Sequence, residues 1–260
     1  MDLQLRHKIV LITGGAKGIG AAIVRALAAE GGIAVIVDRD AEAGNKLREE
    51  LSAQGKACRM ICADLSETVG CADAIGQTLV EFGGLDVLVN NAGINDKIGL
   101  ENGGPADFEA SLNRNLLHYY NLAHFSLAAL KKSHGNIVNV ASKVAVTGQG
   151  GTSGYAAAKG AVLALTREWA VELLPYGIRV NAILPAEVMT PLYQQWLATF
   201  ADPDAKRREI EAKIPLGKRM TQPEEIAATA LFLMSAQANH ITGQHIFVDG
   251  GYTHLDRALT

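Results

Sequence analysis

The sequence contains few cysteines, no long apolar run and no cluster of basic residues. Three cysteines are too few, and odd in number, for a disulfide framework. Cys58 and Cys62 flank one short apolar segment without a His or Cys nearby at zinc spacing, so we expect buried thiols and no metal site. No apolar run approaches the roughly 18 residues of a membrane span. The N-terminus, MDLQLRHKIV, is too short and polar for a signal peptide, and a cytoplasmic setting is expected.

The charges of the chain are nearly balanced, with a formal net charge of -3 at pH 7. Without a basic run we expect no nucleic-acid partner, and without a span no membrane partner. Hydrophobic residues make up 48% of the chain, enough for a substantial core. A length of 260 residues fits one large domain or two small ones. Because no linker or repeat interrupts the chain, we predict one domain over residues 1–260 that binds a small molecule.

A glycine-rich segment follows the first apolar run of the chain. Residues 8–12 are apolar, residues 13–20 read TGGAKGIG, and residues 21–32 have helical periodicity. A strand, a glycine loop and a helix are the context of a dinucleotide-binding fingerprint, in which the backbone approaches a pyrophosphate at a helix N-terminus. A tight turn alone would also explain the glycines. The next predicted strand, residues 33–37, ends on Asp38, which strengthens the signal because a carboxylate there can accept both ribose hydroxyls.

Strands and helices continue to alternate. Predicted helices at 41–53 and 67–82 alternate with predicted strands at 57–62 and 86–89, and further strands are predicted at 136–140, 178–184 and 244–248. This alternation predicts an α/β fold with a doubly wound parallel sheet, whose ligand lies at the C-terminal ends of the strands. Asp64 follows one of these ends, where it contacts the adenine of a cofactor or caps the following helix. The sequence leaves both roles open.

A second motif lies between residues 142 and 159. Tyr155 and Lys159 are four residues apart in an Ala-rich predicted helix, so the phenol and the ammonium share one face. A free tyrosine has a pKa of about 10, and a fixed cation lowers it, which would make Tyr155 a base. Ser142 follows a predicted strand and would hold the oxygen whose proton Tyr155 removes. Taken alone, this spacing more often means a half-buried aromatic residue and a solvated charge.

The ordered set of motifs resembles the short-chain dehydrogenase/reductase family. TGGAKGIG at 13–20, NNAG at 90–93, Asn115, Ser142 and YAAAK at 155–159 follow one another as in that family, over essentially the whole chain. The resemblance implies a single Rossmann-type domain with about seven parallel strands and helices on both faces. It also implies that the nicotinamide of the cofactor accepts the electrons, so that no metal is needed.

The same resemblance implies roles for individual residues. The implied catalytic set, in which Asn115 supports a water that relays the proton, is Asn115, Ser142, Tyr155 and Lys159. The residues implied in cofactor binding are Gly14, Lys17, Gly18, Ile19, Gly20, Asp38, Arg39, Asp64, Leu65, Asn91, Ala92, Gly93, Tyr155, Lys159, Pro185, Val188 and Thr190. The resemblance further implies a homotetramer built from predicted helices at 106–132 and 153–174.

Two residues of the cofactor region favour different cofactors. Asp38 would repel the 2′-phosphate of NADP, which favours NAD. Lys17 stands in the glycine loop, where a basic residue often accompanies NADP in this family. We give more weight to Asp38, so NAD is the predicted cofactor and NADP the second choice.

The positions expected around the nicotinamide are polar. They are Asn95, Asp96, Lys143, Gln149 and Glu187, with Trp196 as an apolar face for a sugar ring. The chain departs from the family after Pro185, where a glycine is usual and Ala186-Glu187 stands here. A carboxylate there would cost desolvation energy beside a steroid or an acyl chain. Any one of these residues is explained by a wet loop, but five from separate segments favour a multiply hydroxylated substrate, which the segment 191–221 would cover.

Local segments resemble one branch of the family more closely. GINDKIGL at 93–100, VTGQGGTSGY at 146–155, PAEVMTPLY at 185–193 and VDGGYTHLDRALT at 248–260 are similar to the L-fucose dehydrogenases. Members of that branch oxidise the anomeric carbon of an aldose to a lactone. The resemblance therefore implies oxidation of L-fucose or a related sugar.

Two other functions remain open at this point. A reductase of 3-oxoacyl thioesters would need NADPH, a basic patch for the acyl carrier and an open apolar groove, against which Asp38 and Glu187 argue. A non-catalytic dinucleotide-binding scaffold would have a damaged catalytic set, whereas all four residues are present here.

Overall fold

The computed structural model describes residues 2–255, within which seven parallel strands form one sheet in the order β3-β2-β1-β4-β5-β6-β7. The strands are β1 (Ile9–Thr13), β2 (Ile33–Asp38), β3 (Cys58–Cys62), β4 (Val87–Asn90), β5 (Asn136–Val140), β6 (Arg179–Pro185) and β7 (His245–Val248). The doubly wound α/β sheet predicted from the sequence is confirmed, and each predicted strand ends within one residue of the observed one.

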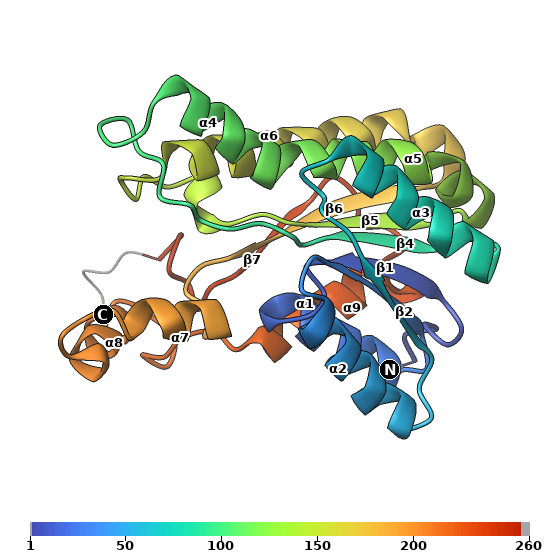
Figure 1. Cartoon of the computed structure of the whole chain (residues 1–260), viewed down its shortest axis with the longest axis horizontal. Coiled ribbons are helices and arrows are strands. Elements are labelled where there is room, and N and C mark those ends of the chain that lie inside the picture. The colour runs from blue at the N-terminus through green and yellow to red at the C-terminus, as the bar shows by residue number, and fades with distance from the viewer. Residues whose placement is uncertain (1, 256–260) are drawn as a thin grey trace.

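Helices cover both faces of this sheet (Figure 1). They are α1 (Gly18–Ala29), α2 (Ala41–Ala53), α3 (Thr68–Phe82), α4 (Pro105–Leu112), α5 (His118–Ser133), α6 (Ser153–Glu172), α7 (Pro191–Leu197), α8 (Pro203–Glu211) and α9 (Pro223–Met234). Buried side chains of α1, α2 and α9 form a core on one face, and those of α3, α5 and α6 form a second core on the other.

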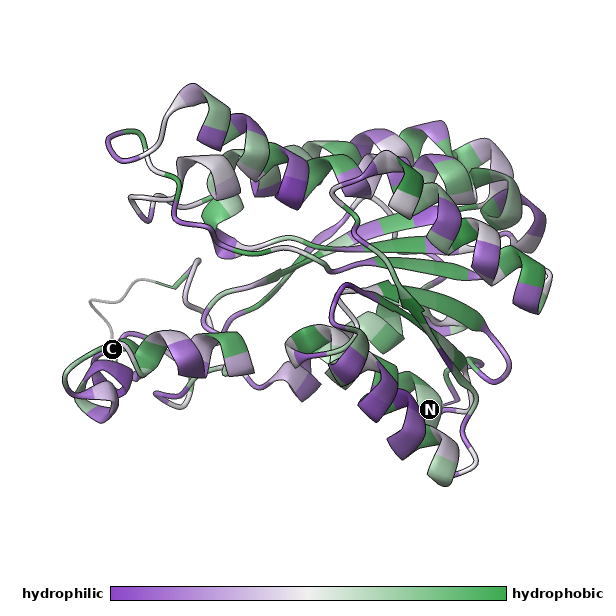
Figure 2. Cartoon of the chain, viewed as in Figure 1, coloured by the Kyte–Doolittle hydropathy of each residue, from purple (hydrophilic) through white to green (hydrophobic). Residues whose placement is uncertain are grey.

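The strands in the middle of the sheet are largely apolar because both of their faces are covered. Every residue of β4 and β5 is buried. Figure 2 shows largely hydrophobic strands between helices that are hydrophobic on one side and polar on the other. This pattern explains why continuous short apolar runs, and not alternating ones, predicted the strands correctly.

The strand order reverses between β1 and β4. β1 pairs with β2 on one side and with β4 on the other, so the chain builds the sheet outward in two directions from this point. In sheets of this kind a ligand binds in the crevice beyond the carboxyl ends of the strands at the reversal. The glycine loop follows β1 and the NNAG segment begins at the end of β4, so both motifs lie at this crevice.

The long helix predicted over residues 106–132 is divided in the structure. α4 ends at Leu112, a π-helical turn spans Asn113–Leu117, and α5 continues to Ser133. Such turns add a residue to a helix and are frequent at functional sites. Sequence periodicity does not reveal the insertion because the turns on either side remain helical.

The cysteine prediction is wrong at one position. Cys62 is exposed at the end of β3, whereas Cys58 is half-buried and Cys71 in α3 is buried. β3 lies at the edge of the sheet, where only one neighbouring strand covers the chain. Across residues 2–255, no helix combines the length and the apolar character that crossing a membrane requires.

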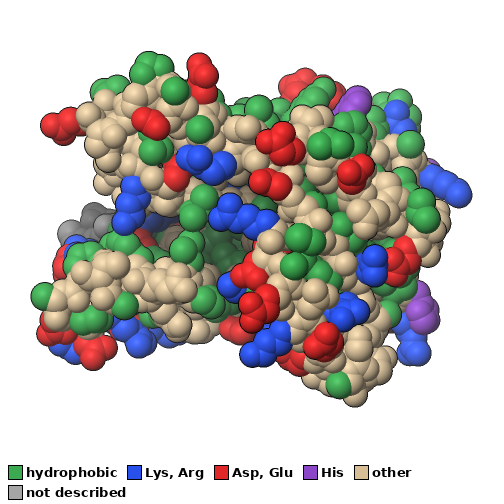
Figure 3. All heavy atoms as spheres, in the orientation of Figure 1, with side chains coloured by type: hydrophobic (Ala, Val, Ile, Leu, Met, Phe, Trp, Pro, Cys, Tyr) green, Lys and Arg blue, Asp and Glu red, His purple; other side chains and the backbone are tan. Residues whose placement is uncertain are grey.

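The segment 191–221 contains the short helices α7 and α8 and stands away from the sheet (Figure 1). The chain enters it directly from β6. Figure 3 shows the surface hollowed between this segment and the side of the molecule that carries α4. Residues 256–260, part of the C-terminal sequence that resembles the L-fucose dehydrogenases, lie outside the described residues.

Candidate active site

The residues implied in cofactor binding lie along the crevice at the carboxyl ends of the strands. The β1–α1 loop and the start of α1 carry Gly14, Lys17, Gly18, Ile19 and Gly20; Asp38 and Arg39 lie at the end of β2; Asp64 and Leu65 follow β3; Asn91, Ala92 and Gly93 follow β4; Pro185, Val188 and Thr190 end or follow β6. An elongated ligand that crosses the sheet from β3 to β6 would pass all of these positions.

The glycine loop permits a close approach of a ligand to the backbone. Gly14 and Gly18 have φ angles of +60° and +55°, in the left-handed region that favours glycine. A Cβ atom at Gly20 would lie 2.1 Å from the carbonyl oxygen of Gly14. Within the described residues, no side chain caps the start of α1. Its first N–H groups can therefore bind an anion such as a pyrophosphate.

Asn91 holds the glycine loop from the neighbouring strand. Its Nδ2 donates to the carbonyl oxygens of Thr13 and Gly14 at 2.9 and 3.2 Å. The backbone N–H groups of Asn91 and Ala92 donate to the hydroxyl of Thr13 at 2.9 and 3.0 Å. Thr13, which the sequence did not single out, thus ties the two strand ends together at the reversal of the sheet.

Asp38 is fixed beside the glycine loop by two backbone groups. Its Oδ2 accepts from the N–H of Ala16 at 3.1 Å and its Oδ1 accepts from the N–H of Asp40 at 3.0 Å. Lys17 forms an ion pair with Asp40 at 2.5 Å, and the hydrogen bond to Asp40 raises the pKa of Lys17. The basic residue that argues for NADP therefore has a carboxylate partner, which sequence reasoning missed.

Asp64 makes a local turn after β3. Its Oδ1 accepts from the backbone N–H and the hydroxyl of Ser66 at 2.9 and 2.7 Å. The hydrogen bond from the Ser66 side chain lowers the pKa of Asp64. The residue at the N-cap of α3 is Glu67, so of the two roles left open, the helix cap is not the one observed.

The half-buried Tyr155 and the buried Lys159 lie together at the start of α6. The Nζ of Lys159 is 5.6 Å from the centroid of the Tyr155 ring, and Lys159 is 2% exposed. This Nζ donates to the Oη of Tyr119 and to the carbonyl of Val140, both at 2.8 Å. The shared face predicted from the spacing is therefore observed.

Desolvation acts on both groups of this pair. Burial raises the pKa of Tyr155 to about 12, although a hydrogen bond with Ser142 lowers it in part. Burial also lowers the pKa of Lys159 to about 7. In each case burial disfavours the charged form. The role of Tyr155 as a base beside Lys159 stays a prediction.

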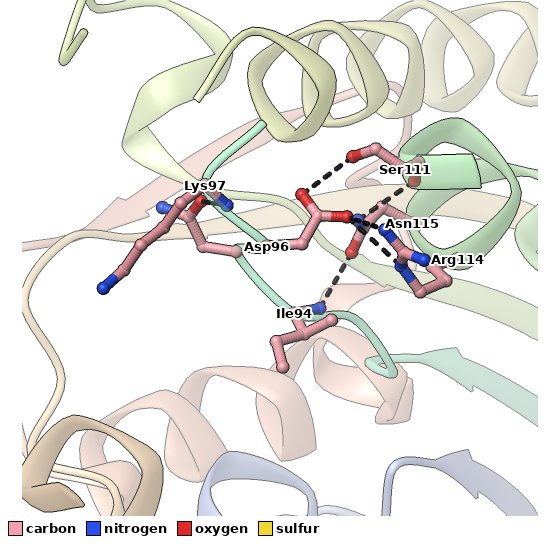
Figure 4. Close-up of polar contacts among 7 residues, drawn as sticks. Ile94, Asp96, Lys97, Ser111, Arg114 and Asn115 are labelled. Carbon is pink, nitrogen blue, oxygen red and sulfur yellow. Dashed lines mark hydrogen bonds and ion pairs between the residues drawn. The ribbon is translucent and has the colours of Figure 1, made fainter. Parts of the chain in front are cut away.

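Asn115 lies in the π-helical turn and is fully buried. Its Oδ1 accepts from the N–H of Ile94 at 2.8 Å and its Nδ2 donates to the carbonyl of Ser111 at 3.0 Å (Figure 4). A Cβ atom at Gly93 would lie 3.2 Å from Oδ1 of Asn115 and 3.4 Å from Nζ of Lys159. Asn115 therefore holds the NNAG segment close to Lys159.

Asp96 and Asn95 have partners within the chain. The Oδ1 of Asp96 accepts from the hydroxyl of Ser111 at 2.9 Å and its Oδ2 accepts from Nη2 of Arg114 at 2.6 Å (Figure 4). The Oδ1 of Asn95 accepts a backbone N–H of the same loop, that of Lys97, at 3.2 Å. These bonds shape the loop after β4 and attach it to α4 and the π-helical turn.

Lys143 and Glu187 form an ion pair, with side chains that are 8% and 15% exposed. The Oε2 of Glu187 accepts from the Oη of Tyr193 at 2.7 Å, and the Nζ of Lys143 lies 4.1 Å from the centroid of the Tyr252 ring. We call these four residues the polar cluster. Lys143 follows β5, Glu187 follows β6, Tyr193 lies in α7 and Tyr252 follows β7. Two predicted substrate residues are thus brought together, while Tyr193 and Tyr252 were missed.

Two further predicted substrate residues, Gln149 and Trp196, are not part of the polar cluster. Gln149 is exposed in the loop before α6. Trp196 in α7 is half-buried and meets the ring of Tyr193 edge-on, with centroids 5.1 Å apart. Thr190 caps α7 by accepting the N–H of Tyr193, and its Cγ2 would lie 3.3 Å from a Cβ atom at Gly18. The start of α7 therefore lies against the glycine loop.

Comparisons with known proteins agree with this geometry. Residues 14–253 match the family model described as enoyl-(acyl carrier protein) reductase. The chain is 41% identical to the L-fucose dehydrogenase of Mus musculus, covering 94% of this chain and 88% of the mouse protein. It is 34% identical to the 3-oxoacyl-[acyl-carrier-protein] reductase FabG of Thermotoga maritima, covering 96% and 99% of the two chains.

Two solved structures are also similar over nearly their full length. The Cj0485 dehydrogenase superposes with a TM-score of 0.95 at 45% identity, covering 100% of this chain and 99% of the other. The ligand-free aldohexose dehydrogenase (AldT) of Thermoplasma acidophilum superposes with a TM-score of 0.88 at 29% identity, covering 98% of each chain.

One protein family accounts for the fold, for the crevice with its glycine loop and for these similarities. Relatives above 30% identity over most of both chains are dehydrogenases and reductases, and the solved dehydrogenase among them superposes over the whole of this chain. The chain therefore belongs to the short-chain dehydrogenase/reductase family, oxidoreductases that act on CH–OH groups with a nicotinamide cofactor.

Proposed function

We propose that this protein is an NAD-dependent dehydrogenase that oxidises the anomeric hydroxyl of an aldose, L-fucose or a related sugar, to the lactone. The observation that carries the proposal is the polar cluster, Lys143, Glu187, Tyr193 and Tyr252, on the substrate side of the crevice. A largely buried ion pair costs desolvation energy, which hydrogen bonds to a hydroxylated ligand offset and an alkyl chain does not. The names of the mouse and Thermoplasma relatives support a sugar as substrate.

The crevice fits a dinucleotide. The glycine loop and the start of α1 would hold the pyrophosphate, Asp38 the adenosine ribose, and Lys159 and Thr190 the nicotinamide half. When bound, the nicotinamide supplies the hydride acceptor, and its oxidised ring adds positive charge. NAD is preferred in this proposal because Asp38 lies beside the loop and Asp40 offsets the charge of Lys17.

The proposed roles of the chain's own residues follow from their positions. Tyr155 removes the proton of the anomeric hydroxyl as the hydride leaves the same carbon. Ser142 hydrogen-bonds the substrate oxygen, and the ammonium of Lys159 favours the phenolate. Asn115 keeps the NNAG segment in place and supports a water through which the proton reaches solvent.

The alternative within the family is a reductase of 3-oxoacyl thioesters. The similarity to FabG of Thermotoga maritima and the description of the matching family model favour it. That function requires an apolar groove for an acyl chain, and the polar cluster would leave charged groups facing it. Asp38 would also disfavour the NADPH such a reductase needs. The sugar is therefore the preferred substrate.

The test is a substrate panel assayed by the formation of NADH with the alcohols and by the loss of NADPH with the thioester. L-Fucose, D-arabinose, L-galactose, D-glucose and a polyol are offered with NAD, and a 3-oxoacyl thioester is offered with NADPH. We expect turnover with L-fucose and its stereochemical relatives. Turnover with the thioester alone would show that the sugar proposal is wrong.

The polar cluster is tested by Glu187→Gln, which removes one charge and keeps the shape of the side chain. We expect kcat/KM for the sugar to fall at least about tenfold, the loss of roughly 1.4 kcal/mol, while KM for NAD changes little. Glu211→Gln is the matched control, because Glu211 pairs with Arg207 in α8. Equal losses toward sugar and NAD would mean that Glu187 has a structural role only.

A further inference from the structure

Tyr119 is the largest side chain among those fully buried in the described part of the chain. It lies in α5, and its Oη donates to the carbonyl of Val140 at 2.8 Å. The same Oη accepts a hydrogen bond from the Nζ of Lys159 at 2.8 Å. A phenylalanine would fill the same space without the cost of burying a hydroxyl. The hydroxyl of Tyr119 therefore serves in hydrogen bonding, and its two partners, Val140 and Lys159, indicate its role.

Lys159 donates two of its three N–H groups to this arrangement. An ammonium has three donors and no acceptor. One is used on Tyr119 and one on Val140, at the carboxyl end of β5. The third remains for the reaction side, where the Tyr155 ring lies 5.6 Å from Nζ. Fixing two donors sets the position of a side chain that otherwise has four rotatable bonds.

We propose that Tyr119 is a positioning residue, whose hydroxyl holds the ammonium of Lys159 in place and in its charged form beside Tyr155. The inference rests on the roles proposed above for Tyr155 and Lys159. It adds a member to the network from a helix that carries no part of the YAAAK motif. Its action is indirect, through Lys159, and it does not require contact with the substrate.

The other ionisable groups around Lys159 do not replace Tyr119. His118 precedes it in α5, and its Nε2 lies 3.1 Å from the carbonyl of Ala92. Burial lowers the pKa of His118 to about 4, so it is neutral near pH 7. Asp96, in the loop after β4, raises the pKa of Tyr155 through its charge and is bound by Arg114. Burial raises the pKa of Tyr119 well above its ordinary value, so it remains a donor to Val140.

The decisive variant is Tyr119→Phe. It removes one hydroxyl and leaves the carbonyl of Val140 with its bond from Lys159, so folding should be unaffected. A hydrogen bond to an ammonium stabilises the charged form, and its loss disfavours that form. We expect the acidic limb of the pH profile of kcat/KM to move up by about 0.5 to 1 pH unit, with kcat/KM on that limb reduced about three- to tenfold.

A matched control is Tyr120→Phe. Tyr120 is the next residue of α5 and is 54% exposed, and the same substitution there should leave the profile unchanged. A Tyr119→Phe profile that superimposes on that of the wild type would overturn the proposal. So would an equal shift in both variants.

A second readout needs no turnover. Lysine labelled with ¹³C at Cε is titrated by NMR in the wild type and in Tyr119→Phe, and the Lys159 signal is assigned by its loss in Lys159→Ala. We expect a lower pKa for Lys159 in Tyr119→Phe, and an unchanged value would count against the proposal. If the wild type accepts the thioester but no aldose, the sugar proposal alone fails. The profile is then measured in reduction, where its alkaline limb should move to higher pH.

Discussion

At the scale of single residues, the proposed choice of cofactor rests on two carboxylates and one ammonium. Asp38 and Asp40 lie on either side of the end of β2, and Lys17 is paired with Asp40. The net charge of this group is negative, although the glycine loop read alone contains only a basic residue. The proposed preference for NAD therefore rests on the three residues together.

The corresponding prediction concerns Asp38→Asn. The amide keeps an acceptor for one backbone N–H but removes the charge that repels a 2′-phosphate. We expect the ratio of kcat/KM for NADP to that for NAD to rise about tenfold, a change of roughly 1.4 kcal/mol. Steady-state kinetics with both cofactors measure it. Asp64→Asn, which changes the other carboxylate of the crevice, is the control and should leave the ratio unchanged.

At the scale of elements, the helical segment after the NNAG segment positions three buried side chains. The π-helical turn positions Asn115, and the first turn of α5 positions His118 and Tyr119. His118 is 1% exposed, and its ring lies 4.7 Å from that of Tyr119. A neutral imidazole is therefore part of the packing beside Lys159.

This burial predicts a pH dependence of stability. Burial lowers the pKa of His118 from 6.5 to about 4. Between these values the unfolded chain binds a proton that the folded chain does not, so the free energy of unfolding falls as the pH falls from 6.5 to 4. The contribution is about 3 kcal/mol, present in full above pH 6.5. His118→Gln should reduce this decline in chemical denaturation, whereas His124→Gln, at an exposed position of α5, should not.

The elements themselves were largely predictable, and the reason is local. Short apolar runs determine the strands, and glycine and capping residues determine where helices begin and end. The four-residue spacing of Tyr155 and Lys159 was enough to place both on one face of α6. The π-helical turn was not predictable, because its insertion leaves the periodicity on either side intact.

Contacts between distant segments could not be predicted in the same way. Tyr119 and Lys159 are brought together by α5 and α6 packing on one face of the sheet. The polar cluster needs four separate segments to meet, and nothing in the sequence around Tyr252 indicates its contact with Lys143. Lys143 and Glu187 were both predicted as substrate residues, but their pairing is visible only in the folded chain.

At the scale of the whole molecule, the predicted homotetramer would have α5 and α6 at its subunit interfaces, which can be tested. Large apolar side chains are exposed on or beside these helices, at Leu117, Tyr120, Val171 and Leu174. Helices with apolar residues facing outward are typical of subunit interfaces. The homotetramer stays a prediction, and these exposed residues are the place to test it.

Val171→Glu should weaken that assembly. A charge buried between two copies of α6 costs several kcal/mol, so the molar mass measured by light scattering should fall from that of a tetramer toward a dimer. Val80→Glu is the control, since Val80 is 89% exposed on α3 and lies outside the two helices. A tetramer with an unchanged mass in Val171→Glu would place the interface elsewhere.

The reversal of strand order between β1 and β4 has a consequence for engineering this chain. The residues proposed to choose the cofactor lie at the end of β2, on one side of the reversal, and the polar cluster lies beyond β5, β6 and β7, on the other. Substitutions at sites that share no partners contribute independently to free energy. We therefore expect substitutions at Asp38 and at Glu187 to act separately on cofactor preference and substrate preference, with additive effects when they are combined.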